Sequence, residues 1–131
     1  MKLNTILISI IAVGILIAGA IVFSGRSKSS QDIPTKENVT VVDGKQIIEI
    51  TAKGGYIPRA SLAKAGLPTI LRFNTQGTFD CSSSVRIPSM NITKLLPNSG
   101  ITDIDLGGPQ VGILQGTCGM GMYQFSVEFQ G

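Results

Sequence analysis

Alternation of apolar and polar residues is the main pattern in the C-terminal two-thirds of the chain. It is clearest where Tyr123, Phe125, Val127 and Phe129 alternate with polar residues. Such alternation predicts a strand with one buried face and one wet face. Shorter segments of this kind, bounded by glycine or proline, predict further strands at residues 46–51, 61–63, 69–74, 83–87 and 101–106. The pattern predicts an all-β domain of antiparallel strands, with helix only as a single turn at residues 92–96.

A second pattern occupies the N-terminus, where Ile6 to Phe23 form a run of eighteen residues without a charge. This length approaches the roughly 20 residues that cross a bilayer core, so we expect a transmembrane helix within an anchor at residues 1–25. A cleaved signal peptide is the alternative, because Lys2 gives a basic start and Ala18-Gly19-Ala20 a small-residue cleavage site. Under both interpretations the rest of the chain is exported. We therefore expect a single-pass protein of the cell membrane with its domain on the extracytoplasmic side.

Composition divides the remaining chain and excludes several functions. Residues 26–38 are rich in Ser, Lys and Gln and predict a flexible linker before a folded domain at residues 39–131. The net charge of +3 owes much to Lys2, Arg26 and Lys28 near the apolar run. The domain itself has no basic stripe, so we expect no nucleic acid partner. Because the sequence has no histidine, most zinc sites and histidine-dependent catalysis are excluded, and we expect no enzyme.

Sulfur-containing side chains gather in one short segment, Cys118-Gly119-Met120-Gly121-Met122. Thiolate and thioether sulfurs are soft ligands that prefer Cu(I) and Ag(I) to hard cations. The two glycines permit positive φ angles and close backbone approach, so that five residues can direct several sulfurs at one point. The segment therefore predicts a site for a soft metal ion, with copper favoured and silver possible in its place.

Two other interpretations of the sulfur atoms stay open. Met120 and Met122 also suit core filling, which is the commonest use of methionine. Cys81 and Cys118 also suit a disulfide, because an exported domain with an even number of cysteines favours one. A metal site and a disulfide both require these cysteines to be neighbours. Since oxidation removes the thiolates, the two states exclude each other at any moment.

Several motifs, taken in order, resemble those of the small cupredoxin-like domains of bacteria, which occur alone behind a membrane anchor and alongside copper-transporting P-type ATPases. They are Gly54-Gly55-Tyr56-Ile57-Pro58, Gly66-Leu67-Pro68 before Leu71-Arg72-Phe73, Cys81 with Val85 and Pro88, and Thr117 to Tyr123. The resemblance covers residues 46–130 and implies a Greek-key antiparallel β-sandwich with a metal site at one end. It implies that Cys81 supplies one ligand from the loop before a middle strand. Cys118, with Met122 or Met120, supplies the others from the loop between the last two strands.

The absence of histidine also separates this chain from blue copper proteins, whose trigonal centres use two histidines and one cysteine. The resemblance therefore implies a module that holds Cu(I) for copper trafficking, sequestration or resistance. A copper-transporting P-type ATPase or another copper carrier is the expected partner. The alternatives are an electron-transfer cupredoxin with an atypical histidine-free centre, and a disulfide-stapled structural β-sandwich without metal. Whether Met90 joins the site stays open.

Overall fold

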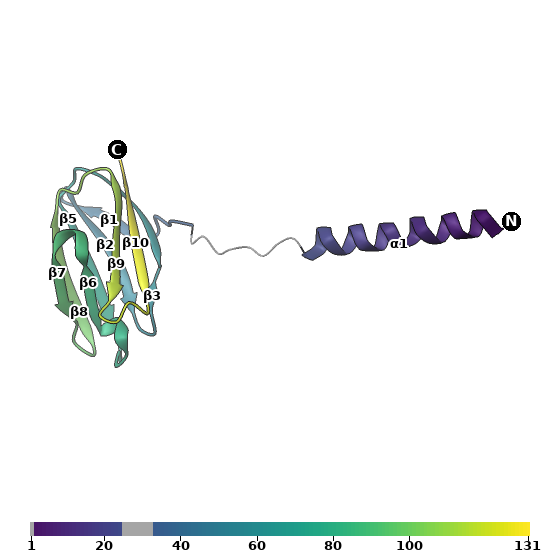
Figure 1. Ribbon diagram of the computed structural model, residues 1–131. Coiled ribbons are helices and arrows are strands. Elements are labelled where there is room, and N and C mark those ends of the chain that lie inside the picture. Colours follow the sequence, from purple (N-terminus) through teal and green to yellow (C-terminus); the bar gives the residue numbers. More distant parts are fainter. Residues whose placement is uncertain (1, 25–32) are drawn as a thin grey trace. The chain divides into compact units, whose positions relative to one another are not determined.

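The computed structural model describes residues 2–24 and 33–131, which belong to two separate compact units. The first unit contains helix α1 (Lys2–Ser24), which covers the predicted apolar segment (Figure 1). In the part of the chain that is described, no helix is both long and apolar enough to cross a membrane. The membrane-spanning part of the prediction therefore gains no support from the structure. Residues 26–32 of the expected linker lie outside the described residues.

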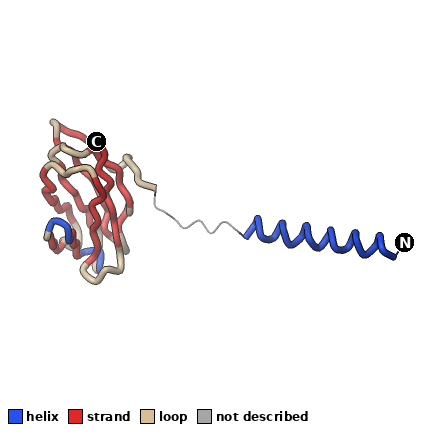
Figure 2. Tube along the Cα trace, turned by 45° about the horizontal axis from the view of Figure 1, so that its top comes forward, coloured by secondary structure: helices blue, strands red, loops and turns tan. Residues whose placement is uncertain are grey.

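The second unit is a β-sandwich of two five-stranded sheets (Figures 1 and 2). The first sheet contains β1 (Val39–Val42), β2 (Lys45–Ala52), β3 (Tyr56–Ile57), β5 (Thr69–Thr75) and β8 (Gly100–Gly107). The second contains β4 (Ala60–Lys64), β6 (Ser84–Ile87), β7 (Ile92–Leu95), β9 (Gly112–Cys118) and β10 (Gln124–Gln130). Two 3-10 turns, η1 (Cys81–Ser83) and η2 (Pro88–Met90), flank β6. The predicted all-β sandwich is confirmed.

The direction of two strand pairs differs from the prediction. Most neighbouring strands are antiparallel, but β2 pairs with β5 and β4 pairs with β10 in parallel. The expectation of a wholly antiparallel sandwich is therefore wrong for these pairs. After β2 the chain crosses to the other sheet as β4 and returns as β5, so that β5 runs in the same direction as β2. Parallel neighbours require such a crossover.

The core lies between the two sheets. It is built from the inward-facing residues of strands in which buried and more exposed residues alternate. Phe125, Val127 and Phe129 of β10 are all buried, as their alternation predicts. The rings of Tyr56, Phe73 and Phe125 meet edge to face, with centroids 5.0–5.9 Å apart. Aromatic pairs favour this geometry because the positive edge of one ring meets the negative face of another. This cluster supports the end of the sandwich at which both cysteines lie.

Residues 92–95 and residues 35–38 differ from the sequence-based expectation. Residues 92–95 form β7, which pairs with β6 at the edge of a sheet, and the predicted helical turn is wrong. Residues 35–38, expected in the linker, pack on the domain. Thr35 forms a β-bridge with Ser61, and the Asn38 amide donates hydrogen bonds of 2.8 Å to the Glu49 carbonyl and the Ser61 hydroxyl. The folded unit therefore begins before Val39.

Gly116 in β9 gives a direct test of core packing. It is buried opposite Phe125 of β10, and a Cβ atom at this position would overlap the Phe125 ring. We expect Gly116→Ala to lower the free energy of unfolding by about 1–3 kcal/mol, because the ring must shift in a close-packed core. Gly108→Ala is the control, since a Cβ there meets its nearest atom at an ordinary 3.6 Å. Urea denaturation measures both; equal stability of the two variants would contradict the packing argument.

Candidate functional site

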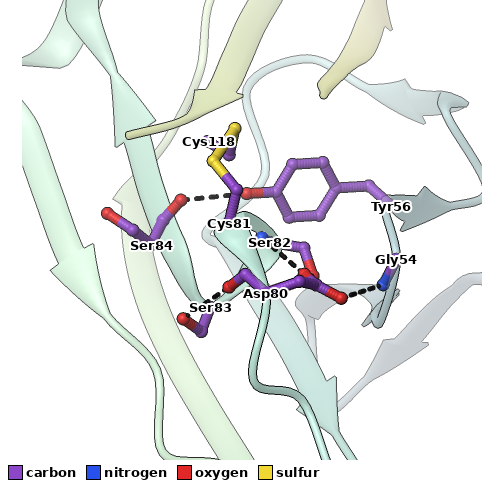
Figure 3. The surroundings of a disulfide bond; sticks show 8 residues. All are labelled: Gly54, Tyr56, Asp80, Cys81, Ser82, Ser83, Ser84 and Cys118. Carbon is purple, nitrogen blue, oxygen red and sulfur yellow. Dashed lines mark hydrogen bonds between the residues drawn. A yellow bond between two sulfur atoms is a disulfide. The ribbon is translucent and has the colours of Figure 1, made fainter. Parts of the chain in front are cut away.

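Three loops converge at one end of the sandwich, and the contacts between them define the candidate site. They contain residues 54–56, 80–84 and 118–123. The Gly54 amide donates a hydrogen bond of 2.7 Å to Oδ2 of Asp80, which joins the first loop to the second. Cys81 and Cys118 join the second to the third, and a Cβ atom at Gly55 would lie 3.6 Å from the Tyr123 ring. Figure 3 shows Asp80, Cys81, Cys118 and Tyr56 grouped at this junction.

The two cysteines are joined in a disulfide (Figure 3). Their Cα atoms are 5.7 Å apart, a separation ordinary for a disulfide. Cys118 ends β9 with 0% of its surface exposed, whereas Cys81 begins η1 and is only partly buried. Both interpretations of the sequence required these residues to be neighbours, and the structure brings them together. In the oxidised state that it records, neither sulfur is a thiolate.

The methionines that were candidate ligands lie at the surface. Met120 and Met122 are 81% and 66% exposed, and Met90 is 39% exposed in η2. The core-filling interpretation of Met120 and Met122 is therefore wrong. Within residues 2–24 and 33–131, no group of three or more His, Cys, Asp or Glu side chains is placed to hold a metal ion.

The loop from Cys118 to Tyr123 is a tight turn that depends on both of its glycines. The Gly121 amide donates to the Cys118 carbonyl, and the Cys118 amide donates to the Tyr123 carbonyl, each at 3.0 Å. Gly121 has a φ of 72°, which side-chain-bearing residues rarely adopt. At Gly119 the requirement is close approach, because a Cβ atom would lie 2.9 Å from the Ser84 hydroxyl. Positive φ and close approach are the two properties expected of these glycines.

Asp80 is a structural residue of the site whose role the sequence did not predict. Its Oδ1 accepts hydrogen bonds from the Ser82 amide, at 2.8 Å, and from the Ser82 hydroxyl. The side-chain hydrogen bond from Ser82 lowers the pKa of Asp80, although partial desolvation opposes the shift. An Asp that accepts from the amide two residues later is a common turn motif, so Asp80-Cys81-Ser82 carried a local signal. The partner Gly54, 26 residues away, carried none.

Tyr56 ties the aromatic core to the same loops. Its hydroxyl donates a hydrogen bond of 3.0 Å to the Ser84 carbonyl (Figure 3). Burial raises the pKa of Tyr56 far above its usual value, and the nearby Asp80 carboxylate raises it further. The phenol therefore stays protonated and remains a donor. The Tyr56 hydrogen bond therefore fixes Ser84 at the start of β6, and the Asp80 side chain fixes the turn that precedes it.

The depressed pKa of Asp80 leads to a prediction about acid stability. A carboxyl whose folded pKa is below its unfolded pKa stabilises the fold at pH values above the unfolded value of about 3.9. This stabilisation is lost as the pH falls through the lower, folded pKa. We expect Asp80→Asn to be less stable than the native protein by a constant amount above about pH 5, and the difference to shrink below it. Thermal unfolding of both proteins between pH 2 and 7 measures this; a difference independent of pH would show that the charge is not involved.

Met122 and Tyr123 also border a groove of about 830 Å³ beside the sulfur-containing loop. The groove is otherwise lined by Ile33, by residues 54–60, by residues 115–117 of β9 and by residues 124–126 of β10. Met122 and Tyr123 therefore belong both to the sulfur-containing loop and to the edge of this groove.

Comparisons with known proteins show the fold. No protein-family model matches the chain, and none of the curated proteins matches it. Among solved structures it is similar to the metal-binding domain of the Cu(I)-exporting P-type ATPase CopA of Streptococcus pneumoniae, solved with Cu(I). The identity is 20% and the TM-score 0.67, over 77% of this chain and 99% of that one. It is also similar to a copper-binding protein solved by NMR in the apo form, with 21% identity and a TM-score of 0.68 over 76% and 99%. The fold implied by the resemblance, a β-sandwich like that of a domain of a copper-transporting P-type ATPase, is thereby confirmed.

Proposed function

We propose that the β-domain is a copper-binding module that holds one Cu(I) ion once the Cys81–Cys118 disulfide is reduced. Two thiolates and one methionine sulfur, from Met122 or Met120, are the proposed ligands. The observation that carries the proposal is the adjacency of the two cysteines across two loops, with both methionines in the loop that follows Cys118. The two similar solved structures support the choice of metal, since one was solved with Cu(I) and the other is a copper-binding protein.

The donor set favours Cu(I) over other ions. The chain has no histidine, and sulfur ligands suit Cu(I) and Ag(I), whereas Cu(II) prefers nitrogen and oxygen ligands in tetragonal geometry. Charge favours the binding of a cation. Reduction leaves Cys118 in a site with no exposed surface, where an uncompensated thiolate is costly. A bound Cu(I) compensates that charge, so loading releases protons and is stronger at higher pH.

The exposure of the methionines supports transfer of copper in preference to permanent storage. Cys118 is buried, but Met120 and Met122 are exposed at the surface. An incoming carrier can therefore replace a thioether ligand before it displaces either cysteine. We propose that the module passes Cu(I) to or from a copper-transporting P-type ATPase or another copper carrier. The chain has no histidine to serve the thiols as an acid or base, and the proposal is a binding module, not an enzyme.

We further propose that the domain functions on the extracytoplasmic side, attached to the cell membrane through residues 6–23. The uncharged run and the disulfide support this, because disulfides persist in oxidising compartments. Protease added to intact cells is expected to digest the domain, while the protein fractionates with membranes. Recovery of a soluble protein shortened at the N-terminus would support the signal-peptide alternative.

Competition for Cu(I) tests the proposed function directly. The full chain in detergent is reduced, kept anaerobic and titrated with Cu(I) against a chelator of known affinity. We expect a dissociation constant far below micromolar for one ion per chain. The oxidised protein is the matched control, because it has the same sequence without thiolates, and it is expected not to compete. A reduced protein that binds more weakly than about micromolar, or no better than the oxidised form, would contradict the proposal.

The disulfide itself favours a second candidate function, a stapled structural sandwich that binds no metal. In that case the bond serves stability alone, and extracytoplasmic accessory proteins commonly use disulfides in this way. The same titration separates the two candidates. Only the copper module gains Cu(I) affinity on reduction.

The glycines of the loop provide a further test of the copper module. Gly121→Val forces a β-branched residue into a positive φ and must change the turn that carries both methionines. We expect Cu(I) affinity to fall about 10–100-fold, the range found when residues supporting a metal site are replaced. Gly66→Val is the matched control, since Gly66 has a φ of 81° and open space around it in another loop. Equal affinities for the two variants would show that the turn does not position a ligand.

A further inference from the structure

The two cysteines of the disulfide differ in exposure. Cys118 is the last residue of β9 and exposes none of its surface, because it belongs to the buried core together with Val85 and Phe125. Cys81 lies in the η1 turn and is only partly buried (Figure 3). Thiol–disulfide exchange requires a thiolate to reach one sulfur atom of the bond. Cys118 offers no exposed surface to such a thiolate, so in the folded protein the attack is expected at Cys81.

We propose that Cys81 is the site at which thiol reductants act on this protein. A reductant thiolate attacks Sγ of Cys81, a new bond joins the two sulfur atoms, and the bond to Cys118 breaks. Cys118 departs with the electron pair as a thiolate and takes up a proton. The second thiol of the reductant, as a thiolate, then attacks the reductant's other sulfur atom, which is bonded to Cys81 in the mixed disulfide. This step releases Cys81 as a thiolate. The protein disulfide gains two electrons, and the dithiol reductant becomes a disulfide.

The geometry also selects the class of reductant. After the first step Cys118 remains beside the mixed disulfide, because the Cα atoms of the two cysteines are 5.7 Å apart and both loops are held by hydrogen bonds. Cys118 can therefore re-form the original disulfide and expel the reductant. A reductant with one thiol must meet a second molecule before this reversal, whereas a dithiol resolves the intermediate within one complex. The expected reductant is consequently a dithiol, either a small molecule or a protein with two neighbouring cysteines.

The turn that presents Cys81 is well supported for this role. The Asp80 side chain fixes the start of η1, the Ser83 amide and hydroxyl both donate to the Asp80 carbonyl, and the Leu96 amide donates to the Ser83 carbonyl at 2.7 Å. Cys81 is therefore presented on a fixed turn, and its accessibility does not require the loop to open. The inference concerns reduction of the protein and requires no bound metal. Its failure and the failure of copper binding are separate outcomes.

A trapped intermediate identifies the attacked sulfur. The full-length oxidised protein, free of metal, is mixed with a large excess of a thioredoxin-type dithiol protein whose second cysteine has been replaced by serine, so that the reductant cannot resolve the mixed disulfide. The excess offsets re-formation of the original disulfide, and free thiols are alkylated after the quench so that no exchange occurs during digestion. After acid quenching, trypsin separates the two cysteines into the peptides Phe73–Arg86 and Leu95–Gly131. We expect the adduct on the first peptide, which contains Cys81. An adduct on the second peptide, which contains Cys118, would overturn the proposal.

Single-cysteine variants give an independent rate measurement. Cys118→Ser leaves Cys81 alone, and Cys81→Ser leaves Cys118 alone, so each variant is the control for the other. In native buffer we expect an aromatic disulfide reagent to modify Cys81 at least about 100-fold faster, because Cys118 reacts only when the structure opens. In concentrated urea the two rates are expected to agree. Similar rates in native buffer would contradict the proposal, and the trapping experiment decides the question if either variant fails to fold.

Discussion

Cys118→Ser is expected to weaken Cu(I) binding by the reduced protein at least about a thousandfold, equivalent to about 4 kcal/mol. Serine is nearly isosteric with cysteine, but its hydroxyl is a hard ligand that stays protonated at neutral pH and binds Cu(I) poorly. The buried position adds to the effect, since no water reaches it to replace the lost ligand. Competition with a Cu(I) chelator measures the change, with reduced native protein as the reference.

Met90→Leu is the matched control for this loss. Met90 lies in η2, outside the loop that carries Met120 and Met122, and leucine preserves its volume without the sulfur. We expect the Cu(I) affinity of Met90→Leu to match that of the native protein. Circular dichroism spectra of both variants test whether each is folded. If Cys118→Ser retains affinity within tenfold of the reference, the buried thiolate is not a ligand and the proposed site is wrong.

The strands that the sequence predicts well are those with one buried face. In β2 and β10, buried and exposed residues alternate along most of the strand, and this is the pattern visible in the sequence. β7 and β9 lack it. β7 is an edge strand with three of its four residues exposed, and β9 contains Gly112 and Gly116, which in a sequence resemble turn residues. Position 116 requires glycine because the Phe125 ring of the neighbouring strand occupies the space of a Cβ atom. No local sequence pattern indicates that contact.

The candidate site was also predictable only in part, because some of its contacts join residues that are distant in the sequence. The sequence, with the cupredoxin-like resemblance, indicated that Cys81 and Cys118 lie together at one end of a sandwich, and the structure confirms their adjacency. It could not decide between thiolates and a disulfide, because that choice depends on the redox conditions as well as on the fold. It also could not predict that Asp80 anchors the Cys81 turn to Gly54, because the anchor depends on two distant loops being brought together. The ligand roles of Met120 and Met122 stay predictions.

Reduction of the disulfide in metal-free protein is expected to lower the free energy of unfolding by about 4 kcal/mol. The bond joins residues separated by 37 positions, and the loss of loop-closure entropy in the unfolded chain gives about 4 kcal/mol for a loop of this size. Single domains have total stabilities of only about 5–15 kcal/mol, so the loss is a large part of the whole. Urea denaturation of oxidised and reduced protein measures it. The double variant Cys81→Ser with Cys118→Ser is the control, because the reductant must leave its stability unchanged.

The stability of the reduced form then determines how copper binding is coupled to folding. A Cu(I) ion held by Cys81 and Cys118 joins the same two loops as the disulfide, and it binds the folded chain in preference to the unfolded one. A ligand at a hundred times its dissociation constant adds about 2.7 kcal/mol, so excess Cu(I) is expected to restore most of the stability lost on reduction. Reduced and oxidised proteins that differ by less than about 1 kcal/mol would show that the loops are held without the bond. In that case the hydrogen bonds of Asp80 and Tyr56 would be sufficient to keep the two cysteines together.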